Sequence, residues 1–149
     1  RFRAHKLIEN SQASSIQDRS IYEDANIFAR ALFEQGDIDE RDYENYRNLF
    51  ESMIQFVNPP SLMIFLKRSV PKLQERICGR GRDYEASIPL DYLTRLNNYY
   101  NEWFMQYDAG KSLIVDTDDL DFLENEEHFE KLVEKIRDSI AQQEMIFHY

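Results

Sequence analysis

Cysteine and long apolar runs are both nearly absent from the chain. Cys78 is the single cysteine among 149 residues, so no intrachain disulfide can form and the disulfide-stapled secreted domains are excluded. The longest apolar run, Leu62 to Leu66, is far shorter than the roughly 20 residues that span a bilayer. We therefore expect a cytoplasmic protein that does not enter a membrane.

Positive charge is also scarce. The chain has 18 lysines and arginines against 28 aspartates and glutamates, a formal net charge of −10. An acidic surface repels phosphates, which argues against binding to a nucleic-acid polymer. The three histidines are scattered without the spacing of zinc ligands. The sequence contains neither a G-x-S-x-G elbow nor a G-x-x-x-x-G-K-[ST] phosphate-binding loop.

Helical periodicity dominates the remaining pattern. Apolar stripes predict helices at residues 1–10, 20–35, 39–57, 71–78, 89–107 and 126–146. The continuous apolar runs in 61–67 and 112–116 predict buried strands, and 14–18 is a weaker candidate. Strands separated by helices indicate an α/β fold with a small parallel sheet flanked by long helices. In such sheets, ligands bind at the carboxyl ends of the strands.

The segment "QDRS", residues 17–20, places an acid and an arginine together just before a predicted helix. A carboxylate there can hold Mg²⁺ directly or through water, and an arginine can orient a hydroxyl nucleophile or a phosphate. The alternative interpretation is an ordinary helix entry, in which Asp18 and Ser20 cap the helix and Arg19 lies in solvent.

The segment "RICGRGR" concentrates positive charge in this acidic chain. Arg76, Arg80 and Arg82 fall within seven positions, beside Gly79 and Gly81. Arginine binds phosphoryl oxygens bidentately and stays charged, while glycines free the backbone to fold over a ligand. The alternative is a solvated turn in which the arginines pair with the neighbouring acids Glu75, Asp83 and Glu85.

Four segments taken together resemble the deoxynucleoside kinases, particularly the bacterial deoxyadenosine and deoxyguanosine kinase branch. They are "QDRSIYEDANIF" (17–28), "SLMIFLKRSVPKLQERICGRGRDYE" (61–85), "IPLDYL" (88–93) and "LIVDTDDLDF" (113–122). The resemblance follows nearly the whole chain in order. It implies a P-loop-kinase-like three-layer α/β fold, mostly helical in these residues, forming one domain over 1–149.

The resemblance assigns nucleoside binding to residues near the start of the chain. Asp18 would help to position Mg²⁺, and Arg19 would contact the sugar 5′-hydroxyl, which is the nucleophile. Phe28 would stack on the nucleobase, and Asp24 would read its edge with Arg1 as the partner of that acid. Two alternatives stay open: Phe28 as a core residue, and Asp24 as a first-turn acid favoured by the helix dipole.

The resemblance assigns the remaining contacts to the second half of the chain. Glu85 would bind the sugar 3′-hydroxyl. A lid at about residues 76–87 would cover the phosphates of ATP with Arg76, Arg80 and Arg82. The loop after the second strand would lie near the adenine of ATP through Asp118, Asp119 and Phe122.

The implied activity is Mg²⁺- and ATP-dependent phosphorylation of a deoxynucleoside 5′-hydroxyl in nucleotide salvage. Deoxyadenosine or deoxyguanosine is favoured, and deoxycytidine is compatible. We also expect a homodimer, built on helices at about 22–35 and 39–57. The family's P-loop lies upstream of the segments present here, so we expect these residues alone to be inactive. Two alternatives remain: another P-loop kinase, such as a nucleoside monophosphate kinase, and a non-catalytic helical interaction domain.

Overall fold

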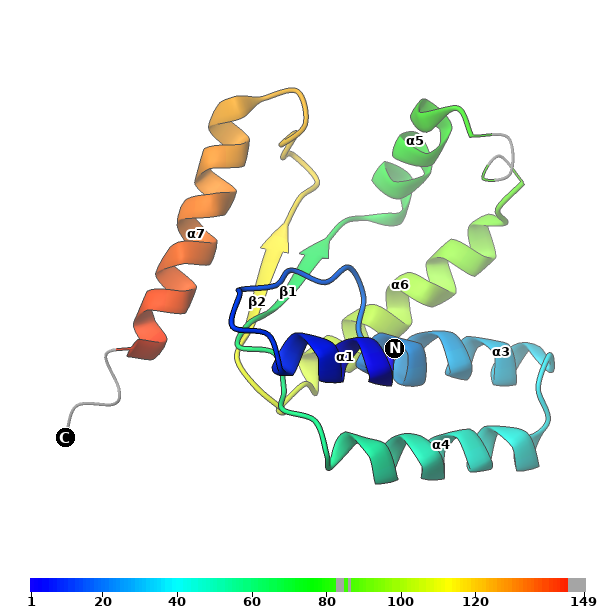
Figure 1. Ribbon diagram of the computed structural model, residues 1–149. Coiled ribbons are helices and arrows are strands. Elements are labelled where there is room, and N and C mark those ends of the chain that lie inside the picture. Colours follow the sequence, from blue (N-terminus) through cyan, green and yellow to red (C-terminus); the bar gives the residue numbers. More distant parts are fainter. Residues whose placement is uncertain (83–84, 86, 145–149) are drawn as a thin grey trace. The chain divides into compact units, whose positions relative to one another are not determined.

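The computed structural model describes residues 1–82, 85 and 87–144. They form two compact units. The first, called the helical unit, comprises Arg1–Pro59 and Asp91–Gln106. The second, called the sheet unit, comprises Pro60–Leu90 and the residues from Tyr107 onward. Figure 1 shows the elements of both units along the chain.

The helical unit contains no strand among its described residues. Its elements are α1 (Phe2–Glu9), α2 (Ile21–Glu23), the π-helix η1 (Asp24–Ala29), α3 (Arg30–Gln35), α4 (Glu40–Ile54) and α6 (Leu90–Met105). These elements confirm the four helices predicted in this part of the chain. The sequence pattern did not predict that the second of them, which runs through α2, η1 and α3, would contain a π-helical segment.

Local side-chain chemistry sets the helix ends. The hydroxyl oxygen of Ser20 accepts the Tyr22 N–H at 3.2 Å, while the Glu23 carboxylate accepts the Ser20 N–H at 2.8 Å, which forms a capping box. Gly36 ends α3 with φ of 81°, a left-handed conformation that glycine adopts without strain. Asp39 begins α4 by accepting the Asp42 N–H at 2.8 Å. Gly36 and Asp39 therefore act as helix caps.

The core of the helical unit joins the π-helix to α6. Ile27, Ala31 and Tyr99 are buried together, and four partly buried residues pack against them: Phe28, Leu96, Tyr100 and Trp103. The apolar stripe of α6 therefore faces η1 and α3, as an amphipathic helix requires. This packing holds the second half of η1, including Phe28, against α6.

The sheet unit has a parallel pair of strands and two long helices. Its elements are β1 (Met63–Lys67), α5 (Val70–Arg80), β2 (Ser112–Asp116) and α7 (Glu126–Glu144). The strands pair in parallel with Phe65 opposite Ile114 and Lys67 opposite Asp116. Both carboxyl ends therefore lie at the same edge, and Figure 1 shows the two arrows pointing the same way. The predicted strands and the mostly helical α/β class are confirmed.

Two local predictions were wrong. Residues 14–18 form no strand, and Ile16 is fully exposed. This run contains a single apolar residue, so it buries too little apolar surface to stabilise a strand. It also has no neighbouring strand to pair with in the described chain. Helix α5 continues past Cys78 through Gly79 to Arg80, and Gly81 ends it with φ of 62°. None of the helices in the described residues is both long and apolar enough to cross a membrane.

Candidate functional site

The sequence-predicted site residues separate into two groups. Five lie in the helical unit and are called the helical-unit site: Arg1, Asp18, Arg19, Asp24 and Phe28. Seven lie in the sheet unit: Arg76, Arg80, Arg82, Glu85, Asp118, Asp119 and Phe122. The structure brings members of each group together, while the roles assigned to them stay predictions.

Arg1 connects the separate segments of the helical-unit site. Its Nη1 donates hydrogen bonds to the carbonyl oxygens of Asp18 at 3.3 Å and Arg19 at 3.5 Å. Its Nε lies 3.4 Å from Oδ2 of Asp24, and about a third of the Asp24 side chain is exposed. The pair therefore still presents N–H donors and a carboxylate acceptor to solvent, side by side. This combination can read a ligand edge that carries both a donor and an acceptor.

Arg19 has an unusual backbone conformation. Its φ is 60°, the one positive φ of a non-glycine residue in the described chain. Left-handed residues other than glycine cost of order 1–3 kcal/mol and cluster at functional sites. The turn places the guanidinium carbon of Arg19 4.9 Å from the centre of the Phe28 ring. A cation–π contact thus links the "QDRS" turn to the π-helix.

Phe28 contacts both the buried core and the helical-unit site. Its ring meets Tyr100 edge to face, with centroids 6.4 Å apart and planes at 82°, and it packs against the buried cluster of Ile27 and Tyr99. The core interpretation of Phe28 is therefore supported. The contact with Arg19 shows that the same half-buried ring also faces the charged turn.

Tyr100 is a residue that sequence reasoning missed, because its place on an aromatic stripe indicated only core packing. Burial raises the pKa of Tyr100 to about 12. Arg19 lowers this pKa, while Glu23, Asp18 and Asp24 raise it. The phenol therefore lies within the electric field of the helical-unit site, and it stays protonated at neutral pH.

The π-helix carries both Asp24, its first residue, and Phe28. Single π-helical turns inside α-helices are frequent at functional sites, because the extra residue changes which side chains share a face. Arg47 of α4 donates to the side-chain oxygen of Asn26 at 3.2 Å. Burial, then the charge of Asp24, raises the pKa of Tyr46. Asn26, Tyr46 and Arg47 are thus neighbours of the site that the sequence did not identify.

Asp18 presents an exposed carboxylate that makes no hydrogen bond or ion pair with the residues described. The same residues contain no group of three or more acidic, histidine or cysteine side chains suited to a metal. Magnesium in kinase sites takes one or two carboxylates together with phosphate oxygens and water. Asp18 fits the part of a single protein ligand in such a shell. The helix-entry alternative is confirmed in part: Ser20 caps the helix and Arg19 is exposed, whereas the Asp18 side chain does not cap the helix.

The predicted lid residues lie at and after the end of α5. Arg76 and Arg80 are in the helix, and Arg82 follows Gly81. Arg82 forms an ion pair with Glu85 at 3.0 Å, as the alternative interpretation expected. The side chain of Glu85 is 13% exposed, and its second oxygen is buried without a hydrogen-bond partner in the described chain. Asp83 lies outside the described residues.

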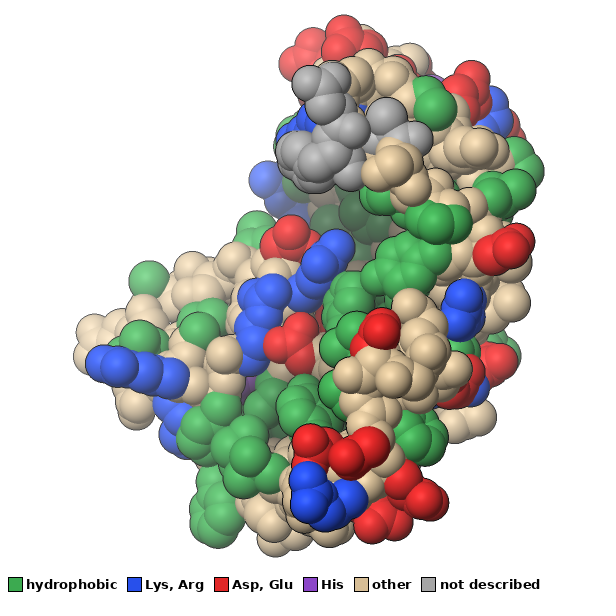
Figure 2. Space-filling view, turned by 90° about the vertical axis from the view of Figure 1, so that its right-hand side faces the viewer, with side chains coloured by type: hydrophobic (Ala, Val, Ile, Leu, Met, Phe, Trp, Pro, Cys, Tyr) green, Lys and Arg blue, Asp and Glu red, His purple; other side chains and the backbone are tan. Residues whose placement is uncertain are grey.

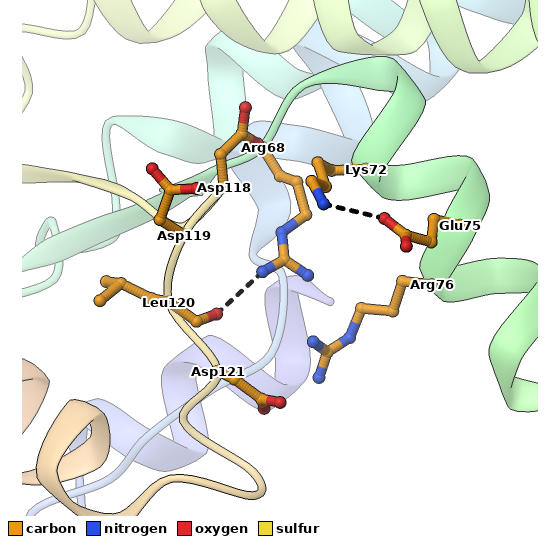
Figure 3. A pocket seen from close by; sticks show the side chains of 8 residues that line it. All are labelled: Arg68, Lys72, Glu75, Arg76, Asp118, Asp119, Leu120 and Asp121. Carbon is orange, nitrogen blue, oxygen red and sulfur yellow. Dashed lines mark hydrogen bonds and ion pairs between the residues drawn. The ribbon is translucent and has the colours of Figure 1, made fainter.

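A pocket of about 420 Å³ opens in the sheet unit between α5 and the loop after β2. Figure 3 shows its lining, which is almost entirely charged: Arg68, Lys72, Glu75, Arg76, Asp118, Asp119, Leu120 and Asp121. The guanidinium carbon of Arg76 also lies 5.7 Å from the ring centre of Phe122. The structure thus brings Arg76, Asp118, Asp119 and Phe122 together.

Hydrogen bonds tie the acids of this pocket to its frame. The backbone N–H of Ser69 donates to Oδ1 of Asp118 at 2.7 Å. The pKa of Asp118 is lowered by this bond, by a second bond from the Ser69 hydroxyl, and by the nearby charges of Arg68 and Lys72. In the sequence, Lys67 and Arg68 follow directly after the apolar run of β1, which is the available signal for Arg68.

Comparison with known proteins gives the family. The family model described as deoxynucleoside kinase matches residues 1–141. The chain belongs to the deoxynucleoside kinase family. It is 32% identical over 138 residues to the deoxyadenosine/deoxycytidine kinase of Bacillus subtilis, covering 91% of this chain and 64% of the relative. It is 42% identical over 103 residues to the deoxyadenosine kinase of Dictyostelium discoideum, covering 69% of this chain and 42% of the relative.

Solved structures agree with this assignment. The deoxyadenosine kinase from M. mycoides with bound dATP superposes with a TM-score of 0.72 at 27% identity, covering 91% of this chain and 68% of that one. The same enzyme with products dCMP and a flexible dCDP gives a TM-score of 0.73 at 26% identity, covering 92% of this chain and 69% of that one. The predicted family and the kinase-like fold are confirmed. The chain spans about two thirds of the length of the B. subtilis kinase.

Proposed function

We propose that the protein transfers the γ-phosphoryl group of ATP to the 5′-hydroxyl of a deoxynucleoside in nucleotide salvage. The observation that carries this proposal is the Arg1–Asp24 pair, which lies beside the Arg19–Phe28 contact in one unit. Membership of the deoxynucleoside kinase family supports it. Because the family match runs through both units, we propose that they act as one kinase domain.

The helical-unit site suits a base that carries an amino group. Adenine, guanine and cytosine each offer a hydrogen-bond donor beside an acceptor, which the Asp24 carboxylate and the Arg1 guanidinium complement. Phe28 supplies a half-buried aromatic ring on which a base can stack. We therefore favour deoxyadenosine or deoxyguanosine as the substrate, with deoxycytidine as a compatible third. The relatives named for deoxyadenosine, deoxyguanosine and deoxycytidine support this choice.

The "QDRS" turn is suited to the sugar end of that nucleoside. We propose that Arg19 contacts the 5′-hydroxyl and stabilises the charge that develops as it attacks. We propose that the exposed Asp18 contributes one ligand to Mg²⁺, with the phosphates of ATP supplying others. Magnesium would neutralise charge on the transferred group. Glu85 keeps its assignment to the sugar 3′-hydroxyl.

The sheet unit suits the phosphate donor. Arg76 and Arg80 make no ion pair with the described residues, so their charge is available to the triphosphate within that part of the chain. Arg82 would exchange its ion pair with Glu85 for a phosphate contact. We propose that Asp118, Asp119 and Phe122 lie near the adenine of ATP. The phosphate-binding P-loop of the family is not among these 149 residues.

We also propose a homodimer in the cytoplasm. Helices α3 and α4 expose large apolar side chains, with Leu32 at 45% and Leu49 at 57%, and the Phe33 and Tyr43 rings stack between them at 4.4 Å. Figure 2 shows apolar side chains exposed among charged ones on one face of the molecule. A reducing cytoplasm would keep the exposed thiol of Cys78 free. Sedimentation equilibrium of the full-length protein tests the dimer.

A substrate panel tests the main proposal. The full-length protein is assayed with Mg²⁺-ATP and each deoxynucleoside, and in parallel with each nucleoside monophosphate. Phosphorylation of deoxyadenosine or deoxyguanosine at the 5′-hydroxyl is the expected result. Activity on monophosphates alone would replace the proposal with a nucleoside monophosphate kinase. If calorimetry detected neither ATP nor nucleoside binding, a non-catalytic interaction domain would be the better description.

A further inference from the structure

The segment Thr117–Phe122, called the pocket loop, connects β2 to the turn before α7 and forms one wall of the charged pocket. It has no helical or strand structure, so its carbonyl groups need partners from elsewhere in the fold. Thr117 is nonetheless buried, with 3% of its surface exposed. The question is which group holds this irregular wall in place.

Lys67 and Ser69 bond to the first two residues of the loop, and Arg68 reaches further along it. It is the first residue after β1, and its half-buried guanidinium reaches across to the loop that follows β2. Its Nε donates to the Thr117 carbonyl at 3.0 Å, and its Nη2 donates to both the Thr117 and the Leu120 carbonyls, the latter at 2.9 Å. The bond to Leu120 is visible in Figure 3. Among the described residues, Arg68 is the one hydrogen-bond donor to the Leu120 carbonyl.

The geometry of this contact requires arginine. The two carbonyls are three residues apart and are bridged by one planar fork with several fixed N–H donors. A lysine ammonium is a compact charge on a flexible stem and cannot reproduce the fork, although it keeps the positive charge. Hydrogen bonds from a charged donor are also roughly twice as strong as neutral ones.

The other cations of the pocket have different partners. Lys72 forms an ion pair with Glu75 at 3.0 Å. Arg76 makes no hydrogen bond or ion pair with the residues described, and its guanidinium carbon lies 5.7 Å from the ring centre of Phe122. Arg68 therefore uses its donors on backbone carbonyls, whereas Arg76 keeps its donors for a ligand within the described part of the pocket.

We propose that Arg68 is a positioning residue, which fixes the pocket loop so that Asp119, Asp121 and Phe122 lie opposite Arg76 at the right spacing for a nucleotide. Arg68 acts through the loop and not through contact with the nucleotide. The identity of that nucleotide as the ATP donor rests on the proposed function. The positioning role itself rests on the three hydrogen bonds and on the pocket.

The test compares Arg68→Lys and Arg68→Gln in the full-length protein with Arg137→Lys, an exposed arginine of α7 in the same unit. For both Arg68 variants we expect KM for ATP to rise about tenfold, as the loss of a charged hydrogen bond predicts. KM for the deoxynucleoside should stay within twofold. The control should match the wild type in both constants.

Amide hydrogen exchange supplies a readout that does not depend on activity. In both Arg68 variants the amides of the pocket loop should exchange faster, while those of β1 and β2 keep their protection at temperatures below the melting transition. The proposal is overturned if Arg68→Lys leaves both loop exchange and KM for ATP unchanged. It is also overturned if only Arg68→Gln is impaired, because charge and not geometry would then be what matters. A wild-type protein that phosphorylates no deoxynucleoside would refute the proposed function, while the exchange comparison would still decide whether Arg68 fixes the loop.

Discussion

The helical-unit site and the charged pocket of the sheet unit handle charge in different ways. In the helical unit, the charged residues lie beside aromatic rings, as the contact between Arg19 and Phe28 shows. The Phe28 ring in turn packs against Tyr100. In the sheet unit, the pocket is lined almost wholly by charged side chains on a helix and an irregular loop. A site with a ring and one donor–acceptor pair selects by shape and hydrogen bonding. The pocket holds four acids against three cations, but Arg76 makes no ion pair with the described residues, so its N–H donors can bind a phosphate.

This contrast supports different roles for the two units, which we propose for the kinase. The helical unit would select the nucleoside, and the sheet unit would bind the charged donor. Replacements in the first unit should then change which base is used or whether transfer occurs. Replacements in the second should change ATP binding, except at Glu85, which we assign to the sugar 3′-hydroxyl. The expected effects below run from the largest to the smallest.

Arg19→Ala should have the largest effect. Removing a group that contacts the nucleophile and stabilises charge in the transition state lowers kcat by about 10²–10³ in comparable sites. Arg19 is exposed, so the melting temperature should change little. Steady-state kinetics and thermal unfolding of the same preparation check both points. Full activity in this variant would remove the assigned role and, with it, the claim that transfer chemistry belongs to the helical unit.

Arg80→Ala should affect ATP and not the nucleoside. Arg80 is exposed and makes no ion pair with the described residues, so its loss should leave the fold intact. We expect KM for ATP to rise by about tenfold or more, since one charge-assisted contact to phosphate is lost. KM for the deoxynucleoside should not change. Arg137→Ala, in exposed α7, is the matched control. An equal rise in both KM values would break the proposed division.

Asp24→Asn should alter base preference more than total activity. The amide is isosteric but loses the negative charge that pairs with Arg1 at 3.4 Å. A site that hydrogen-bonds the edge of one base rejects a different base, because the polar groups of the site would then be left without partners. We expect the ratio of kcat/KM values for two deoxynucleosides to shift by about tenfold. Competition between deoxyadenosine and deoxycytidine in one reaction measures this ratio, and an unchanged ratio would contradict the base-reading role.

High pH should reveal the buried phenols of the helical unit. Burial raises the pKa of Tyr99 and of Tyr100 to about 12, and the hydrogen bond to Glu34 adds to the shift for Tyr99. An unfolded tyrosine ionises near pH 10. The contribution to stability is therefore complete below about pH 10 and is lost as the pH rises towards 12.

Absorbance of tyrosinate during a pH titration, combined with urea unfolding at each pH, measures this effect. Tyr100→Phe removes one late-ionising phenol, and we expect it to reduce the fall in stability between about pH 10 and 12. Tyr92→Phe, in the same helix, serves as the control. If Tyr100→Phe and Tyr92→Phe gave identical titrations, the claim that burial raises the pKa of Tyr100 would be contradicted.

Much of the fold could be predicted because it depends on residues close together in the chain. Gly36 ends a helix through its own φ, and Asp39 begins one through an N–H three residues away. The continuous apolar runs of β1 and β2 predicted the two strands, and their parallel pairing followed from the helices between them. The resemblance in sequence also identified the family, which the family model confirmed.

The site was predicted less completely. Asp24 and Arg1 were expected to be partners only because of the resemblance, and the structure shows them as an ion pair. Tyr100 was hidden in an aromatic stripe, since periodicity does not distinguish a core ring from one beside charges. Arg68 was hidden for a different reason. Its partners lie on a loop roughly fifty positions away, and no local pattern marks such a contact.

The sequence by itself determined the order of helices and strands, the caps that bound them and the charged segments that carry the chemistry. These depend on periodicity, backbone propensity and hydrogen bonds within a few residues. Only the tertiary structure decided that residues 14–18 form no strand, that a π-helix carries Asp24 and Phe28, and that Arg68 bonds to the pocket loop. Each of these depends on what lies beside a segment in space, and burial and hydrogen-bond partners are set there by residues far away in the chain.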